Sequence, residues 1–179
     1  MENQTLALIA SFIAMAFVVA SYFTRKKTYY LLCQLLCIAF LVVSYFFTVQ
    51  FFAMIGLAVG FLRAITFFLY EKKGRLAPLY WSFILAGLTI SSYFIVNLVI
   101  LKSAQPLDIL CVVALVGYAF IFRIRNLKIV RYTMIFPTVL SILFNVLSGA
   151  ALFATLTYVF ELSANIVSIF KYHVFNKNK

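Results

Sequence analysis

The sequence predicts an all-α polytopic membrane protein with seven transmembrane helices, and three observations lead to that prediction. Hydrophobic residues make up 66% of the chain and charged residues only 11%, whereas a soluble domain carries about a quarter charged residues. Seven apolar runs, most of them near the length that crosses a bilayer core, are separated by short polar breaks. The basic residues gather in alternate breaks, where they act as topology signals.

The apolar runs fall into two groups of three with a single run between them. Residues 1–75 hold the first group, residues 76–103 the linking run, and residues 104–179 the second group with a basic tail. The seven expected helices cover residues 6–23, 29–47, 51–70, 79–101, 107–122, 130–147 and 150–170. Two three-helix units joined by one helix run in the same direction across the membrane. We therefore expect two parallel triple-helix bundles joined by a linker helix.

The polar breaks mark the ends of the first three predicted helices. The first run is followed, not preceded, by the cluster at Arg25, which argues against a secretory signal. An uncharged turn separates the second and third runs, and a basic break ends the third. The same order of breaks returns in the last three runs, with Arg25 and Arg125 lying 100 residues apart. This spacing indicates an internal repeat.

The remaining helices carry two informative prolines. The fourth run begins directly after Pro78, a residue that is tolerated at the start of a helix. The fifth run is short. The sixth contains Pro137, which removes one backbone hydrogen bond and is expected to kink that helix.

The basic residues predict the orientation of the chain. The breaks between the runs alternate between one side of the membrane and the other. One side holds thirteen of the fifteen Lys and Arg residues, the opposite side holds Lys102, and Arg63 lies within a helix. By the positive-inside rule the side with thirteen is cytoplasmic, so the amino terminus is outside and the carboxyl terminus inside. The thirteen cytoplasmic residues are Arg25, Lys26, Lys27, Lys72, Lys73, Arg75, Arg123, Arg125, Lys128, Arg131, Lys171, Lys177 and Lys179.

The distribution of charge also limits the partners. A formal charge of +11 carried by short loops indicates contact with anionic lipid headgroups at the cytoplasmic face rather than nucleic acid binding. Association with further copies of the chain, as a homo-oligomer, is also left open. Tyrosines beside the basic breaks are interpreted as an aromatic belt at the membrane interface. They are Tyr22, Tyr29, Tyr30, Tyr70, Tyr80 and Tyr172.

Two charged residues lie deep within apolar runs, Arg63 in the third and Glu161 in the seventh. A charged side chain at the centre of a bilayer costs about 2.5–3.5 kcal/mol on insertion scales, so it needs a partner or a cavity. Both lie at similar depth, which permits a pair that lines a path or a fixed structural bridge. Arg63 could instead extend towards the cytoplasmic interface. At the 100-residue offset Glu161 matches Phe61, so symmetry alone does not direct the two charges at each other.

Two asparagines extend the set of candidate residues for a substrate path. Asn165 lies four residues after Glu161 and shares its helix face. Asn145 lies near the outer end of the sixth helix, where capping is the simpler explanation. Interhelical hydrogen bonding is the ordinary role of such amides, at about 0.6 kcal/mol each. The candidates are therefore Arg63, Asn145, Glu161 and Asn165.

The sequence does not predict catalysis, a cofactor or a metal site. No histidine lies within an apolar run, and there are no paired carboxylates and no glycine-rich phosphate loop. The usual groups for acid–base or nucleophilic chemistry are therefore missing. Cys33, Cys37 and Cys111 all lie within apolar runs. An odd number of cysteines in such places indicates side-chain packing, not a disulfide framework.

A family resemblance agrees with this layout. The 3+1+3 order resembles the SWEET and PQ-loop transporters, in which two triple-helix bundles surround a central path. Residues 60–70 with the following Glu-Lys-Lys, residues 165–171, and Asn145 before Ser148-Gly149 are more similar to the bacterial inner-membrane YgjV family. That resemblance implies a location in the bacterial cytoplasmic membrane. The chain lacks a Pro-Gln pair in an early helix of either repeat, which argues against sugar transport.

Two functions from different classes remain open. One is a small-solute transporter or facilitator, in which a central path lies between the helix bundles. The other is a non-transporting accessory or partner-binding protein, in which Arg63 and Glu161 form a structural pair. A polar cavity reached by Glu161 and Asn165 would favour the first function, and dry packing of both side chains would favour the second.

Overall fold

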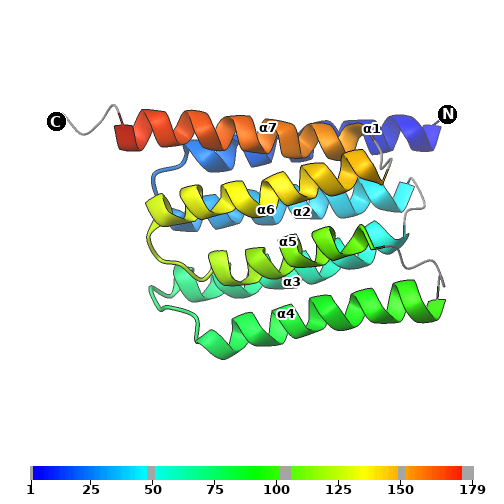
Figure 1. The fold of residues 1–179 in the computed structure, drawn as a ribbon. Helices are drawn as coiled ribbons and strands as arrows, with labels where there is room; N and C mark the ends of the chain where they lie inside the picture. Colours follow the sequence, from blue (N-terminus) through cyan, green and yellow to red (C-terminus); the bar gives the residue numbers. More distant parts are fainter. Residues whose placement is uncertain (1, 48–50, 101–105, 149–151, 175–179) are drawn as a thin grey trace.

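The computed structural model describes residues 2–47, 51–100, 106–148 and 152–174, and it is helical throughout these ranges apart from the short connections (Figure 1). The predicted all-α fold is confirmed, and each predicted run contains a helix. The uncharged turns after the second and sixth runs, Lys102, Lys177 and Lys179 lie wholly or partly outside the described residues. The helices are α1 (Glu2–Phe23), α2 (Lys27–Phe47), α3 (Phe51–Lys72), α4 (Leu79–Tyr93), α5 (Asp108–Ile121), α6 (Leu127–Leu147) and α7 (Leu152–Ile169).

Two of these helices continue as π-helical turns. The residues Phe94–Ile100 extend α4, and Phe170–Val174 extend α7. Near the first of these turns the Asn97 amide donates to Asp108 Oδ2 at 2.9 Å, which ties the linker to α5. Asn97 therefore makes an interhelical bond, the ordinary role of an amide in a membrane protein.

Length and composition identify helices that can cross a membrane. Within the described residues, four spans meet both criteria: Gln4–Phe23, Lys27–Ser44, Leu79–Asn97 and Leu127–Leu147. Helix α5 is apolar but shorter, at 14 residues. The outer surface carries large apolar side chains such as Phe83 and Phe136, whereas several polar side chains are buried. That inverted distribution suits a lipid environment, where polar groups turn towards protein.

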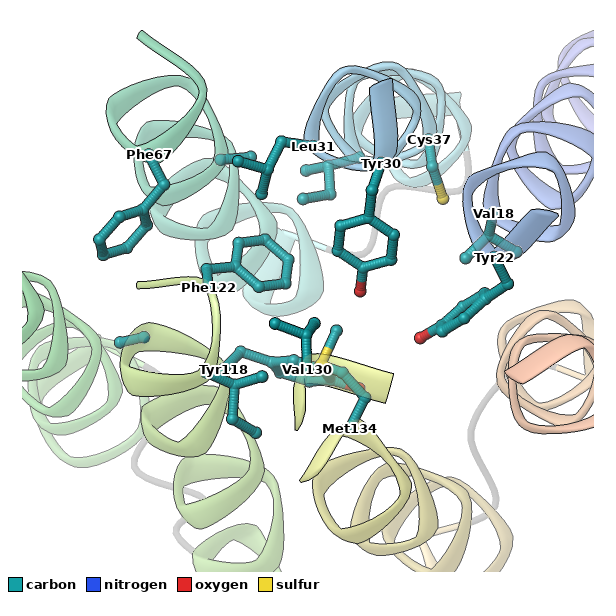
Figure 2. Close-up of a cluster of buried hydrophobic side chains, with 14 of the residues drawn as sticks. Val18, Tyr22, Tyr30, Leu31, Cys37, Phe67, Tyr118, Phe122, Val130 and Met134 are labelled. Atoms are coloured by element: carbon teal, nitrogen blue, oxygen red, sulfur yellow. The ribbon is translucent and has the colours of Figure 1, made fainter. Parts of the chain in front are cut away.

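The helices form two layers that close into a ring. Helices α1, α2 and α3 form one layer and α7, α6 and α5 the other, with α4 beside α3 and α5 (Figure 1). Each helix contacts its neighbours in the chain, and α1 also contacts α7. The hydrophobic core lies between the layers and includes Val18, Leu31, Phe122 and Met134 (Figure 2).

Helices α1 and α2 approach closely because small side chains line their contact. Ala7 and Ala14 are buried on α1, and the Ser11 and Ser44 hydroxyls lie 2.7 Å apart. Ser44 also donates to the Ala7 carbonyl at 2.9 Å. Small residues let helix backbones approach in a membrane, where van der Waals contact replaces the hydrophobic effect as the driving force.

This contact predicts a cysteine cross-link. In a variant without the native cysteines, Ser11→Cys combined with Ser44→Cys should form a disulfide on mild oxidation, because the side chains already touch. Electrophoretic mobility and thiol alkylation report the bond. Ser11→Cys with Ser163→Cys is the control, since Ser163 is exposed on α7. Equal cross-linking of both pairs, or of neither, would contradict the helix arrangement.

One end of the bundle, where α1, α3, α5 and α7 end, is basic; we call it the basic end. Lys27 forms an ion pair with Glu71 at 3.3 Å, which joins α2 to α3. Arg131 donates to the Tyr22 carbonyl at 3.0 Å and to the Thr24 carbonyl at 2.6 Å. The Arg131 bonds connect the two layers at the basic end, whereas the Lys27–Glu71 pair lies within one layer.

Candidate functional site

A cavity of about 50 Å³ lies between the two layers. Five helices supply its walls: α1, α2, α3, α5 and α7. Apolar side chains such as Val18, Ile38 and Leu115 form much of the lining. The polar lining residues are Gln34, Arg63, Tyr118, Thr157, Tyr158 and Glu161. The cavity therefore combines an apolar wall with one cation and one carboxylate.

Arg63 enters the cavity from α3 with only 5% of its surface exposed. Its Nη1 donates to the Leu115 carbonyl of α5 at 2.9 Å. The guanidinium carbon lies 5.2 Å from the ring centre of Tyr118 and 5.1 Å from that of Phe122, within the range of cation–π attraction. Arg63 thus points into the bundle, and it does not extend to the interface.

A glycine one turn before Arg63 leaves room for its side chain. A Cβ added at Gly60 would lie 3.5 Å from Arg63 Nη2 and 4.0 Å from Ile38 Cδ1. Both residues line the cavity. The Nε of Arg63 is buried without a hydrogen-bond partner among the described atoms. The guanidinium is therefore buried with part of its hydrogen-bonding capacity unused.

Glu161 reaches the same cavity from α7 and is also 5% exposed. Its Oε1 accepts a hydrogen bond from the Tyr22 hydroxyl of α1 at 2.8 Å. Tyr22 in turn contacts Tyr30 of α2 edge-on, with ring centres 5.6 Å apart. Figure 2 shows the hydroxyls of both tyrosines pointing into the space between the layers. The carboxylate is thereby held in place by the opposite layer.

Arg63 and Glu161 do not form the direct ion pair that the sequence allowed. Between described residues, the one ion pair within 4.0 Å joins Lys27 and Glu71. The two deep charges instead have separate partners, the Leu115 carbonyl and the Tyr22 hydroxyl, and line one cavity. Both residues therefore line the cavity, but they do not form an ion pair with each other.

The two asparagine candidates lie elsewhere. Asn165 is fully buried, and its Nδ2 donates to the Arg131 carbonyl at 2.8 Å, which joins α7 to α6. Asn145 is buried near the other end of α6, and its Nδ2 has no partner among the described atoms. Neither is among the residues that line the cavity. Of the four candidates, only Arg63 and Glu161 reach it.

Because Asn165 does not line the cavity, we expect its substitution to leave solute binding intact, unlike substitution of Glu161. Asn165→Leu should lower the unfolding temperature, because it removes the hydrogen bond to the Arg131 carbonyl and places a larger side chain at a fully buried position. Any stabilisation by a bound solute should persist in this variant. Thermal unfolding with and without solute measures both effects, with Ser163→Ala as the exposed control. A solute effect lost in Asn165→Leu but kept in the control would place Asn165 in the site.

Several residues near the cavity were not predicted. Tyr22 and Tyr30 were interpreted as part of an interfacial belt, and this was wrong, because both are fully buried. Tyr29 and Tyr80 are more than half exposed, as a belt requires. The signal for Tyr22 was its spacing, since Ala14, Val18 and Tyr22 lie four residues apart on one helix face.

Metal ions in proteins require a set of ligand side chains that lie close together. In the described part of the chain, no group of three or more His, Cys, Asp or Glu residues is close enough to hold a metal ion. Cys37 is buried, and Cys33 and Cys111 are half-buried; all three are free. The arrangement can bind charged or hydrogen-bonding groups through Arg63 and Glu161.

Comparison with known protein families gives a match that covers most of the chain. The family model Imp-YgjV, described as a bacterial inner membrane protein, matches residues 5–175. No curated protein and no solved structure matched the chain.

Proposed function

The chain belongs to the Imp-YgjV family of bacterial inner membrane proteins, and from this premise we propose that it transports or facilitates the passage of a small polar solute. One observation carries the proposal. Arg63 and Glu161 line the same cavity from opposite layers and do not form an ion pair with each other. We assign these two residues to the substrate path.

The energetics of buried charge support this assignment. A purely structural pair would have the two charges in contact, since burying ions is compensated only by close pairing and hydrogen bonds. Here each charge has its own neutral partner and also faces the cavity. A cavity of about 50 Å³ exceeds the minimum of about 10–15 Å³ that one water needs. A hydrated site between opposite charges is suited to polar ligands.

We further propose that all seven helices cross the membrane, with the amino terminus outside and the carboxyl terminus in the cytoplasm. The clustering of described Lys and Arg residues at the basic end supports this orientation. Arg25 and Lys26 are exposed there, where they are available to anionic lipid headgroups.

The burial pattern supports two related units, α1–α2–α3 and α5–α6–α7, on either side of the path. Where both units repeat the same fold, buried positions should recur at a fixed spacing along the chain. Ten pairs of described residues 100 apart, between residues 14–41 and 114–141, are buried in both units: Ala14 and Ala114, Val18 and Tyr118, Ser21 and Ile121, Tyr22 and Phe122, Tyr30 and Val130, Leu31 and Arg131, Gln34 and Met134, Cys37 and Pro137, Ile38 and Thr138, and Leu41 and Ser141. Parallel repeats with a site between them are an established transporter plan.

The third helices of the two units follow the same pattern with one added residue. The buried positions of α3 recur in α7 at a spacing of 101, as in Gly60 and Glu161, or Arg63 and Ala164. Glu161 therefore corresponds to Gly60, which lies three residues from Arg63 and on the same helix face. Related positions in the two units would thus direct both charges towards the interface between them.

A solute screen tests the proposal. The purified protein in detergent is heated with a panel of small polar solutes, and a solute that raises the unfolding temperature is then assayed for flux in proteoliposomes. Glu161→Gln should lose the solute-dependent shift and the flux. Glu71→Gln is the control, because Glu71 pairs with Lys27 away from the cavity.

Two results would contradict the proposal. A stabilising solute that crosses proteoliposomes no faster than protein-free vesicles would favour a non-transporting, partner-binding protein. A shift of equal size in Glu161→Gln and in the wild type would remove Glu161 from the site.

A further inference from the structure

We propose that the cavity selects a small zwitterion, a solute that carries one cationic and one anionic group on a short carbon chain. This inference rests on the proposed function, since it names the substrate class of the same site. It follows from the charges, the geometry and the size of the cavity.

The charges of the cavity favour a ligand with both signs. Arg63 and Glu161 both line it, and no atoms of the two groups lie within ion-pair distance. A lone anion would be attracted by Arg63 and repelled by Glu161, and a lone cation would meet the reverse. Binding either ion would add a net charge to the buried site, and burying an uncompensated charge away from water is costly. A zwitterion adds no net charge and supplies a partner to each residue.

The geometry assigns the two ends of the ligand. Gly60 lacks a side chain beside Arg63 Nη2, and both residues line the cavity. A carboxylate can therefore bind Arg63 through charge-assisted hydrogen bonds. The cationic end would lie against Glu161, whose Oε1 is fixed by the Tyr22 hydroxyl. Val18 and Ile38 provide an apolar wall for the carbon chain between them.

The size of the cavity restricts the chain length. A volume of about 50 Å³ exceeds by only a few-fold the minimum of about 10–15 Å³ that one water needs. The cavity therefore suits a small ligand. Glycine, with five non-hydrogen atoms, is the zwitterion chosen to match it.

Four small probes that differ in charge test the selection in the purified full-length protein: glycine, acetate, methylammonium and acetamide. Calorimetric titration and thermal unfolding measure their binding. Glycine should bind at least tenfold more tightly than each of the other three. Glu161→Gln should reverse the order, because only the cation at Arg63 then remains and acetate becomes the preferred probe. Glu71→Gln should keep the glycine preference.

Any other ranking overturns the inference. Binding of acetamide or of a singly charged probe as tight as that of glycine would show that the paired charges do not select the ligand. An unchanged ranking in Glu161→Gln, or no binding of glycine at all, would do the same. Flux assays distinguish failure of the zwitterion inference from failure of the transport proposal. Glycine binding without flux would overturn transport alone, and flux of an uncharged solute without glycine binding would overturn the zwitterion alone.

Discussion

Replacing Arg63 with methionine should abolish solute flux and leave the protein folded. Arg63 is buried and makes one hydrogen bond, to the Leu115 carbonyl. Exchange of buried ionic groups for apolar ones of similar volume is often neutral or stabilising by about 1–4 kcal/mol. The solute, in contrast, would lose its cationic partner. We expect flux to fall more than tenfold, with an unfolding temperature equal to or above that of the wild type.

Arg63→Lys is the matched control for charge. Lysine keeps the cation but loses the planar group that lies over Tyr118 and Phe122. It should retain a measurable part of the flux. A methionine variant that unfolds at much lower temperature and is rescued by lysine would indicate a structural role. Flux that persists in the methionine variant would remove Arg63 from the path.

Gly60→Leu should block the path by filling it. The added Cβ would lie 3.5 Å from Arg63 Nη2, so the rest of the side chain must enter the cavity or displace the guanidinium. Overpacking of this kind costs about 1–3 kcal/mol. We expect flux to fall to the level of protein-free vesicles, with a modest decrease in the unfolding temperature.

Gly87→Leu controls for the change of residue type. Gly87 lies on α4, where an added Cβ meets no atom within 4 Å, so both flux and stability should stay near wild type. Gly60→Ala should also be tolerated, because its added Cβ makes only ordinary contacts. Undiminished flux in Gly60→Leu would mean that the solute does not pass this cavity.

Much of the fold could be predicted from the sequence because the length of an apolar run determines a membrane helix almost by itself. The predicted run 29–47 and the helix Lys27–Phe47 differ by two residues at one end. Helix rotation could not be predicted in the same way. Tyr29 is 56% exposed and Tyr30 fully buried, although both are equally close to the basic break. Position along the chain gives depth in the membrane, but only contacts between helices decide which side faces the core.

The candidate site was predicted in part for the same reason. Arg63 and Glu161 could be identified, because charge within an apolar run is conspicuous. Their partners could not, since the Leu115 carbonyl and the Tyr22 hydroxyl come from distant helices. In the proposed repeat, a spacing of 101 for the last helix pairs Glu161 with Gly60 in place of Phe61, and Glu161 and Gly60 are both buried.

The contact between α1 and α7 has a consequence for how the protein is made. Tyr22 and Glu161 lie 139 positions apart in the chain, so Tyr22 leaves the ribosome long before its partner exists. At synthesis rates of about 5–20 residues per second the delay is roughly 7–28 s. During that interval the inward face of α1 must be covered by α2, by lipid or by an insertion factor. The ring can therefore close only after α7 has been synthesised.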